Sequence, residues 1–388
     1  MLALAGKPVT RIDRYVLHRL LAAFGLAALV LVLVYWVNRA VILFDQLISD
    51  GQTAWVFLEF TALALPSIVR IVLPLAAFAA ALWGINRMQG DSEVAVLQAT
   101  GASPWAIARP VLLFGLIVGA LVAILSHVLA PAAASRLGER RAEIAETATA
   151  RLLRPGEFVS PLPGLTLYIR EVTPGGEFRG VLLSDSRAAE EERGTNVTTT
   201  AASAYLVRSA AGPQLVMVDG QIERLDRATG RLAVTSFGDL AYDLGALLPD
   251  ARRDRRSTGE IGTGELLRAS PALQAEMGQP PELLRARAHL RIAEALLAPA
   301  AALIAVGCLL VGRFSRLGAW PQVALAVLLA IAVSLLDSSA DAAVEETPAL
   351  WPLAYAPALA GMAAAALLLW LAARPRRGAG ARLAEAPA

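Results

Sequence analysis

The sequence is poor in lysine, cysteine and histidine, and each shortage argues against a class of chemistry. Lys7 is the only lysine, and it precedes Pro8 without the glycine-rich turn that a P-loop requires, so we expect no Walker-type ATPase site in this chain. Cys308 is the only cysteine and lies in an apolar run, which argues against a disulfide framework and a cysteine-based metal site. The three histidines are scattered, and no nucleophile–base pair or pair of catalytic carboxylates is evident. We therefore do not expect an enzyme.

Apolar residues, by contrast, are abundant. The chain has 388 residues, of which 56% are hydrophobic and 18% charged, and its mean hydropathy is +0.55. This composition is typical of a protein that crosses a membrane several times and has a water-exposed portion. Six apolar runs are long enough to cross a bilayer as helices, which takes roughly 20 residues each. They span residues 20–37, 57–83, 104–129, 292–311, 319–336 and 353–371.

The first run lies close to the N-terminus and could be mistaken for a signal peptide. It ends in the bulky Tyr35 and Trp36 and has no small-x-small cleavage site, so we interpret it as an uncleaved first span.

Charged residues at the ends of the six runs are segregated by sign. One set of ends is basic: Lys7, Arg11, Arg14, Arg19, Arg87, Arg109, Arg313, Arg316, Arg374, Arg376 and Arg377. The opposite short loops are acidic: Asp45, Asp50, Glu59, Asp337, Asp341, Glu345 and Glu346. Because basic residues are retained on the cytoplasmic side, this asymmetry predicts that both termini are cytoplasmic and that the segment between the third and fourth runs lies outside.

The segment between the third and fourth runs differs in character from the rest of the chain. Residues 136–153 mix Arg and Glu at helical spacing and are expected to extend the third helix. From Phe158 onward, short β-type runs alternate with Gly, Pro and Asp, which predicts an all-β sandwich or roll. These runs are 165–170, 178–183, 204–207, 214–218, 221–225 and 231–235, with a hairpin-like turn at 226–230. Residues 265–291 are expected to be helical.

The predicted organisation therefore has four parts. Residues 1–130 form transmembrane helices 1–3, residues 131–289 form a periplasmic β-rich domain with flanking helical linkers, residues 290–373 form transmembrane helices 4–6, and residues 374–388 form a cytoplasmic tail. The fold class is a polytopic α-helical membrane protein with six transmembrane helices and an inserted all-β, jellyroll-like domain.

A short polar stretch, residues 91–101, separates the second and third runs. Asp91 or Ser92 can accept hydrogen bonds from the free amides of a first helical turn, and Gly101 suits a left-handed stop. The stretch is too short and too charged to cross a bilayer, so it is predicted to be a helix at the membrane face that a soluble partner could hold. Glu93 either stabilises the helix dipole or contacts a basic groove on that partner.

The next helix has its own start signal. Ser103-Pro104 begins it, and Pro104 occupies a position where no amide is needed.

Two arginines are candidates for binding lipid. Arg39 lies about 30 Å along the first helix from Arg19, near the outer headgroup level, where it either snorkels or pairs with a lipid phosphate. Arg70 is flanked by apolar residues within the second run, and an arginine inside a membrane usually faces protein or water. Asp337 is a possible partner for Arg70.

The stretch from residue 91 to residue 103, DSEVAVLQATGAS, resembles the coupling-helix motif of a known family: an acidic residue, an apolar stretch and Ala-x-Gly-x-Ser. The family is the LptF/LptG permeases of the lipopolysaccharide export ABC transporter. The order of three spans, a β-rich domain and three spans is similar to the family over nearly the whole chain. Residues 12–16 (IDRYV), 165–171 (LTLYIRE) and 180–185 (GVLLSD) resemble LptF more than LptG.

The resemblance implies a permease subunit without its own ATPase activity. An LptB-type ATPase dimer would use ATP and Mg²⁺, so no cofactor is expected on this chain. The first and fifth spans of this chain and of a homologous permease, LptG, would line a cavity open to the outer leaflet of the bacterial inner membrane. Lipopolysaccharide would be extracted there and passed through β-jellyroll domains towards LptC and the periplasmic bridge. No nucleic acid is implied.

The resemblance also implies roles for particular residues. Glu93 matches the coupling-helix glutamate, and Arg39 lies where family members carry basic residues. Asp337 and Asp341 depart from the family by placing acids at the outer end of the fifth span. The expected ATPase-coupling residues are Asp91, Ser92, Glu93, Val94, Leu97 and Gly101, and the lipid-binding candidates are Arg39 and Arg70.

Other functions fit parts of the same pattern. The chain could be the paralogous LptG, or a mechanotransmitting or sensing protein in which an extracytoplasmic β-domain signals to a cytoplasmic partner. An ion-coupled secondary transporter would require acidic residues near the membrane midplane, and we expected none.

Overall fold

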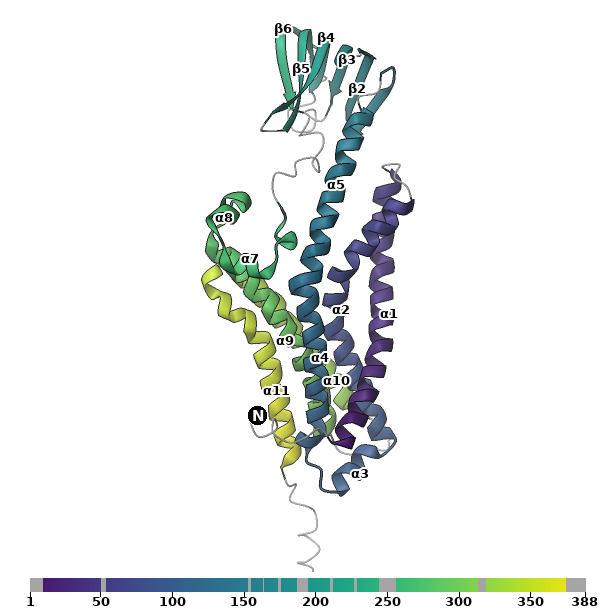
Figure 1. The fold of residues 1–388 in the computed structure, drawn as a ribbon, viewed down its shortest axis with the longest axis vertical. Coiled ribbons are helices and arrows are strands. Elements are labelled where there is room, and N and C mark those ends of the chain that lie inside the picture. Colours follow the sequence, from purple (N-terminus) through teal and green to yellow (C-terminus); the bar gives the residue numbers. More distant parts are fainter. Residues whose placement is uncertain are drawn as a thin grey trace, which may run out of the picture. The chain divides into compact units, whose positions relative to one another are not determined.

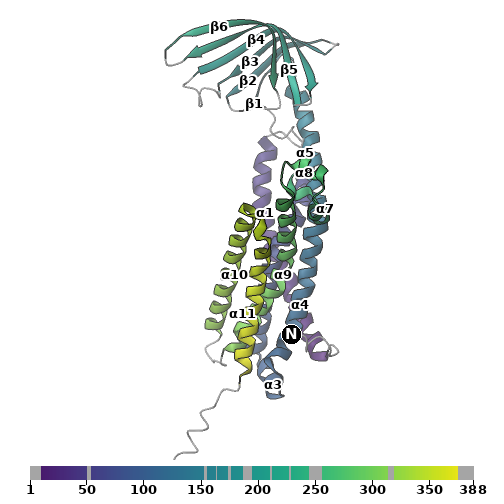
Figure 2. The same ribbon diagram turned by 90° about the vertical axis from the view of Figure 1, so that its left-hand side faces the viewer.

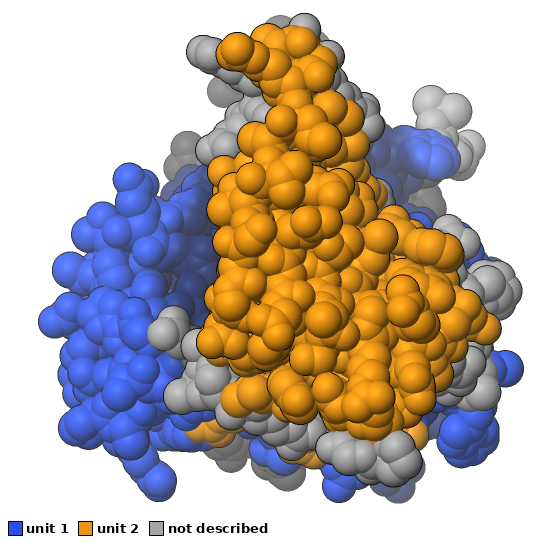
Figure 3. All heavy atoms as spheres, turned by 90° about the horizontal axis from the view of Figure 1, so that it is seen from above, with its two compact units in different colours: residues 1–137, 257–388 blue, residues 138–256 orange. Residues whose placement is uncertain are grey.

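The computed structural model describes residues 10–49, 54–152, 155–162, 164–173, 176–186, 195–209, 212–226, 229–243, 256–312 and 319–374. The chain divides into two compact units, coloured separately in Figure 3. One unit contains residues 1–137 and 257–388 and is helical, and the other contains residues 138–256 and holds the β-sheet.

The helical unit is a bundle of long apolar helices (Figures 1 and 2). Its elements are α1 (Arg11–Ser49), α2 (Ala54–Gly90), α3 (Glu93–Ala99), α4 (Pro104–Ile124), η2 (Leu125–Leu129), η4 (Thr258–Glu260), α7 (Thr263–Arg268), α8 (Pro271–Met277), α9 (Pro281–Val311), α10 (Trp320–Glu346), η5 (Pro348–Tyr355) and α11 (Ala356–Ala373). Six helices among the described residues are long and apolar enough to cross a membrane. They span Arg11–Ile42, Ala54–Gly90, Pro104–Glu143, Pro281–Val311, Trp320–Glu346 and Pro348–Ala373, which confirms the six predicted spans.

The third span begins and continues as predicted. The Ser103 hydroxyl accepts a hydrogen bond from the Ala106 amide, and Pro104 is the first helical residue. After α4 the helix passes through one π-turn, η2, and proceeds without interruption into α5 (Ala130–Leu152). The charged extension predicted for residues 136–153 is therefore helical as far as Leu152, and residue 153 lies outside the described residues.

Helix α9 lies at the centre of the bundle, and α1 and α10 lie at its periphery. Of the apolar window of α9, 67% is buried, whereas the corresponding share is 11% for both α1 and α10. Helix α9 packs against α2, α4, α10 and α11. Its contact with α4 is close because Gly115 and Gly119, one turn apart, face Pro299 and Ala295 of α9. Small residues at this spacing let two membrane helices approach closely.

The second unit contains one six-stranded antiparallel sheet whose strands are neighbours in chain order (Figure 2). The strands are β1 (Phe158–Leu162), β2 (Leu165–Val172), β3 (Glu177–Asp185), β4 (Thr195–Ser209), β5 (Gly212–Asp226) and β6 (Leu232–Asp243). Alternate residues of β2, such as Leu165, Leu167 and Ile169, are buried in one apolar cluster, as expected for a sheet with one covered face. The inserted β-rich domain is thus confirmed.

One detail of the strand prediction is wrong. The runs 214–218 and 221–225 were predicted as separate strands. They form a single strand, β5, in which Asp219 adopts a positive φ of 53° while the chain continues. The strand persists because β4 and β6 pair with it on both sides of Asp219.

The sheet unit is narrower than the range 131–289 assigned from the sequence. Residues 257–289 belong to the helical unit, where Ile261, Leu266, Leu273 and Leu284 form a small core. The Arg291 guanidinium fastens this segment to α9 by donating to the carbonyl oxygens of Thr258 and Ile261, both at 2.6 Å.

Candidate functional site

Helix α3 is the short element that connects two long spans, and its C-terminal stop is as predicted. Gly101 has a φ of 87°, in the left-handed region that favours glycine. The Ala102 amide donates to the Leu97 carbonyl and the Gly101 amide donates to the Gln98 carbonyl, both at 3.0 Å. This pair of hydrogen bonds is the Schellman motif, which satisfies carbonyls left free at a helix end.

The N-terminal start of α3 differs from the prediction. Ser92 precedes the helix with a φ of 61°, and its side chain accepts no capping hydrogen bond. Asp91 instead accepts a hydrogen bond from Arg87 Nε at 3.2 Å and lies 3.8 Å from an Arg19 nitrogen. The expected cap is wrong because ion pairs orient the carboxylate of Asp91 towards neighbouring helices.

Glu93 makes the most direct connection between α3 and another span. Arg19 Nη1 of α1 donates to Glu93 Oε1 at 2.7 Å, and the Tyr15 hydroxyl lies 3.2 Å from both carboxylate oxygens. Tyr15 and Arg19 are four residues apart and so lie on one face of α1, with the guanidinium carbon 5.3 Å from the tyrosine ring centroid. Glu93 is therefore half-buried in an interhelical ion pair.

The apolar residues predicted for coupling attach α3 to the bundle. Val94 is only 4% exposed and belongs to the main hydrophobic core, and Leu97 packs against the same core. Val96 points the other way and is 62% exposed. Of the predicted coupling residues, Val94 and Leu97 face inward, Glu93 faces α1, and Asp91, Ser92 and Gly101 are exposed.

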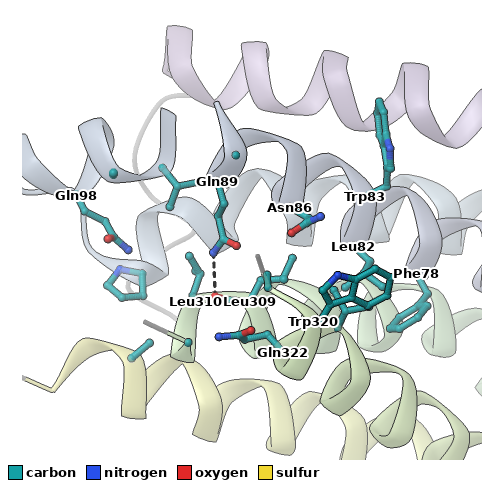
Figure 4. Close-up of a pocket in the computed structure, with 18 of the residues that line it drawn as sticks. Phe78, Leu82, Trp83, Asn86, Gln89, Gln98, Leu309, Leu310, Trp320 and Gln322 are labelled. Carbon is teal, nitrogen blue, oxygen red and sulfur yellow. Dashed lines mark hydrogen bonds between the residues drawn. The ribbon is translucent and has the colours of Figure 1, made fainter. Parts of the chain in front are cut away.

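A cavity of about 1270 Å³ lies beside α3, between the ends of α2, α9, α10 and α11. Its walls combine aromatic residues with uncharged amides, including Trp83, Trp320, Asn86 and Gln322. Figure 4 shows Gln89 spanning part of it, where Nε2 donates to the Leu309 carbonyl at 2.9 Å. This hydrogen bond joins α2 to α9 within the lining of the cavity.

Arg70 lies well inside its helix, because α2 begins sixteen residues earlier at Ala54. Its Nη1 donates to Glu294 Oε2 of α9 at 2.8 Å and to Ser126 Oγ at 3.1 Å. The Ser126 hydroxyl in turn donates to the same Glu294 oxygen at 2.9 Å. Arg70 thus pairs with Glu294 and not with Asp337, which was one possible partner, and Arg70, Ser126 and Glu294 form a closed polar triangle between three spans.

The π-turn of the third span helps to place Ser126 in this triangle. Ser126 is 1% exposed and lies within η2, the wide turn between α4 and α5. Wide turns of this kind are rare and occur often at functional positions in helices.

The remaining lipid-binding candidate, Arg39, is on the outer part of α1 and is exposed. Its neighbours on α1 are exposed apolar residues, among them Val34 at 63% and Val41 at 56%. On α10, Leu328 and Leu335 are each 64% exposed. The first and fifth spans therefore carry the largest uncovered apolar surfaces expected for contact with lipid or another membrane subunit.

Four residues of these networks were not predicted: Tyr15, Arg19, Ser126 and Glu294. Arg19 was counted only as a basic end residue. Glu294 contradicts the expectation that no acid would lie inside a span, and a signal for it existed, because it is the only acid between Glu282 and Asp337. Tyr15 lies within the family-like stretch 12–16, but that stretch does not indicate a bond to Glu93, and the sequence offers no signal for Ser126.

Comparison with known proteins agrees with this architecture. The model of the family described as lipopolysaccharide export system permease LptF/LptG matches residues 14–372. The chain is 22% identical over 208 residues to the lipopolysaccharide export system permease protein LptF of Escherichia coli K12, covering 54% of this chain and 56% of that protein. The same values hold for LptF of Shigella flexneri.

A longer match, also 22% identical, extends over 262 residues of the uncharacterized protein RP871 of Rickettsia prowazekii, covering 67% of this chain and 70% of that protein. The chain thus spans a little over half the length of the LptF proteins that it matches. Because the family model covers nearly all of the six spans and the sheet between them, the chain belongs to the LptF/LptG family of lipopolysaccharide export system permeases.

Proposed function

We propose that this chain is an LptF-type permease that works with a separate ATPase dimer to extract lipopolysaccharide from the outer leaflet of the inner membrane. The paralogous LptG role is the alternative. The observation that carries the proposal is α3, a short helix held between two spans by buried Val94 and by the Glu93–Arg19 pair, with an exposed outer face. A soluble ATPase that moved this helix would move the spans attached to it.

The exposed faces of α1 and α10 support a second permease, an LptG-type subunit, as the membrane partner. Each span has only 11% of its apolar window buried within this chain, so each has surface available for a partner and a lipid cavity. In this proposal the α3 end of the bundle is cytoplasmic, in line with the basic residues at that end, and the sheet is periplasmic. The sheet would pass lipid to an LptC-type protein.

We expect Glu93→Ala to reduce the amount of ATPase that co-purifies with the permease, or to uncouple ATP hydrolysis from lipid export. The substitution removes the carboxylate and hence both the tie to α1 and any contact with a basic groove on the ATPase. Co-purification from detergent and export by reconstituted vesicles measure the two effects. Arg14→Ala, which removes an exposed charged side chain outside α3, serves as the control. Wild-type assembly and export in Glu93→Ala would eliminate the coupling role.

We expect Arg39→Glu to lower crosslinking between the first span and lipopolysaccharide. A guanidinium at the outer headgroup level attracts a lipid phosphate, and a carboxylate repels it. Crosslinking from a photoreactive residue on α1 measures the contact. Arg14→Glu makes the same charge change at the opposite end of α1 and should leave crosslinking unchanged. If Arg39→Glu also crosslinks at the wild-type level, Arg39 is only an interfacial anchor.

A further inference from the structure

The first turns of α1 contact both elements that follow the second span. Tyr15 and Arg19 hold Glu93 of α3, and Asp13 lies 3.6 Å from Arg109 of α4. Asp13 is fixed in turn by Thr10, whose amide donates to the Asp13 carboxylate at 2.9 Å. Asp13 is only 7% exposed, so the ion pair that it forms at this end of α1 is largely shielded from solvent.

The apolar face of the same turns anchors α1 in the core. Val16, Leu20 and Phe24 recur at spacings of four residues and are at most 9% exposed. They belong to the core cluster that also contains Val94 of α3. The base of α1 is therefore joined to α3 by packing on one face and by ionic bonds on the next.

We propose that Arg19, assisted by Tyr15, is a positioning residue that couples movement of α3 directly to α1. The inference rests on the proposed function, in which α3 receives the movement of an ATPase. Without the Arg19–Glu93 bond, α3 would be connected to the rest of the bundle mainly through α2, the residues leading into α4, and the packing of Val94 and Leu97. With the bond, a displacement of α3 pulls on α1, a span with only 11% of its apolar window buried within this chain.

The charged groups at this site pair with one another. Glu93 accepts hydrogen bonds from Arg19 and Tyr15, and Asp91 forms ion pairs with Arg87 and with the second terminal nitrogen of Arg19. Arg19 thus bridges two carboxylates, which its planar guanidinium can do and a lysine ammonium cannot do with the same geometry. Val96 of α3 is 62% exposed, so a partner can contact α3 without displacing Arg19.

The test uses the complex of this chain with its ATPase and partner permease, reconstituted in lipid vesicles. Three quantities are measured: the ATPase retained on purification, the ATP hydrolysis rate, and the lipopolysaccharide released per ATP hydrolysed. We expect Arg19→Ala to retain the ATPase and to lower lipid release per ATP by about tenfold, within the usual range of coupling between sites. Arg14→Ala removes an exposed arginine of the same helix and should match the wild type.

Arg19→Lys keeps the positive charge but cannot bridge Glu93 and Asp91 with the planar geometry of a guanidinium, so it should recover only part of the lost coupling. A wild-type ratio of release to hydrolysis in Arg19→Ala would overturn the inference, as would a ratio in Arg19→Lys no better than that in Arg19→Ala. Loss of the ATPase itself from Arg19→Ala complexes would also overturn it, because Arg19 would then act in assembly. If Arg19→Ala does not reach the membrane, Tyr15→Phe, which removes only the hydroxyl, is compared in the same way.

Failure of the proposed function gives a different result. In that case the wild-type complex itself would release no lipid in response to ATP, whatever residue stands at position 19.

Discussion

Replacing Glu294 with alanine is expected to destabilise the helical unit by up to about 3 kcal/mol, because removing one member of this partly buried ion pair leaves an uncompensated charge. Arg70 would keep only the Ser126 hydroxyl as a described partner of Nη1, and its Nε already has no hydrogen bond. Ser126 would lose the acceptor of its own hydroxyl proton.

Thermal unfolding in detergent measures this loss, which corresponds to a fall of roughly 5–10 °C in the midpoint for a unit of this size. Glu282→Ala, an exposed change in the first turn of the same helix, is the matched control and should shift the midpoint little. The informative variant is the double replacement of Arg70 and Glu294 by leucine. Exchanging a whole buried ion pair for apolar residues is often neutral, so the double variant should be more stable than Glu294→Ala.

A double variant as unstable as the single one would show that the triangle does not act as an ion pair. A wild-type midpoint for Glu294→Ala would show that the connection between α2, η2 and α9 contributes nothing measurable.

Enlarging Gly115 or Gly119 is expected to separate α4 from α9. A Cβ atom at Gly115 would lie 2.6 Å from the Cα of Pro299, and one at Gly119 would lie 2.7 Å from the carbonyl oxygen of Ala295. Both obstacles are backbone atoms, so no side-chain rotation relieves the clash. Each Gly→Ala change should cost about 1–3 kcal/mol, as overpacking does, despite the better helix propensity of alanine.

Gly25→Ala on α1 is the matched control, since no atom lies within 4 Å of the Cβ it would introduce. It should be neutral or stabilise by up to about 1 kcal/mol through helix propensity. Unfolding midpoints of the three alanine variants, measured in one detergent, test this order. If Gly119→Ala unfolds at the same temperature as Gly25→Ala, the close contact between α4 and α9 does not limit stability.

The parts of the fold that the sequence predicted correctly depend on local patterns. The six spans were predictable because a helix that crosses a bilayer needs a long apolar run. The end of α3 was predictable because a positive φ favours glycine, and Gly101 follows the helix. Short β-type runs gave most of the sheet. The first half of β4 was missed because its residues Thr198, Thr199 and Thr200 lie among polar neighbours, and its pairing with β3 and β5 supplies the stability that composition does not indicate.

The site was less predictable because its bonds join residues distant in the chain. Glu93 and Arg19 are 74 positions apart, and Arg70 and Glu294 are 224 apart. A sequence shows that a charge lies in an apolar run, as for Arg70, but not which helix packs beside it. Asp337 and Glu294 were both available as acids, and only the packing of α2 against α9 distinguishes between them.

The shape of α1 has a mechanical consequence. Its core contacts end at Leu31, and the residues that fix it most firmly, from Asp13 to Phe24, lie near one end. Such a helix is expected to tilt about its fixed end. With about 30 Å between Arg19 and Arg39 at 1.5 Å per residue, a tilt of roughly 5° at that end would carry Arg39 about 3 Å sideways. A hydrogen bond cannot stretch that far, so in the proposed function a small rotation beside α3 would be enough to release a lipid phosphate from Arg39.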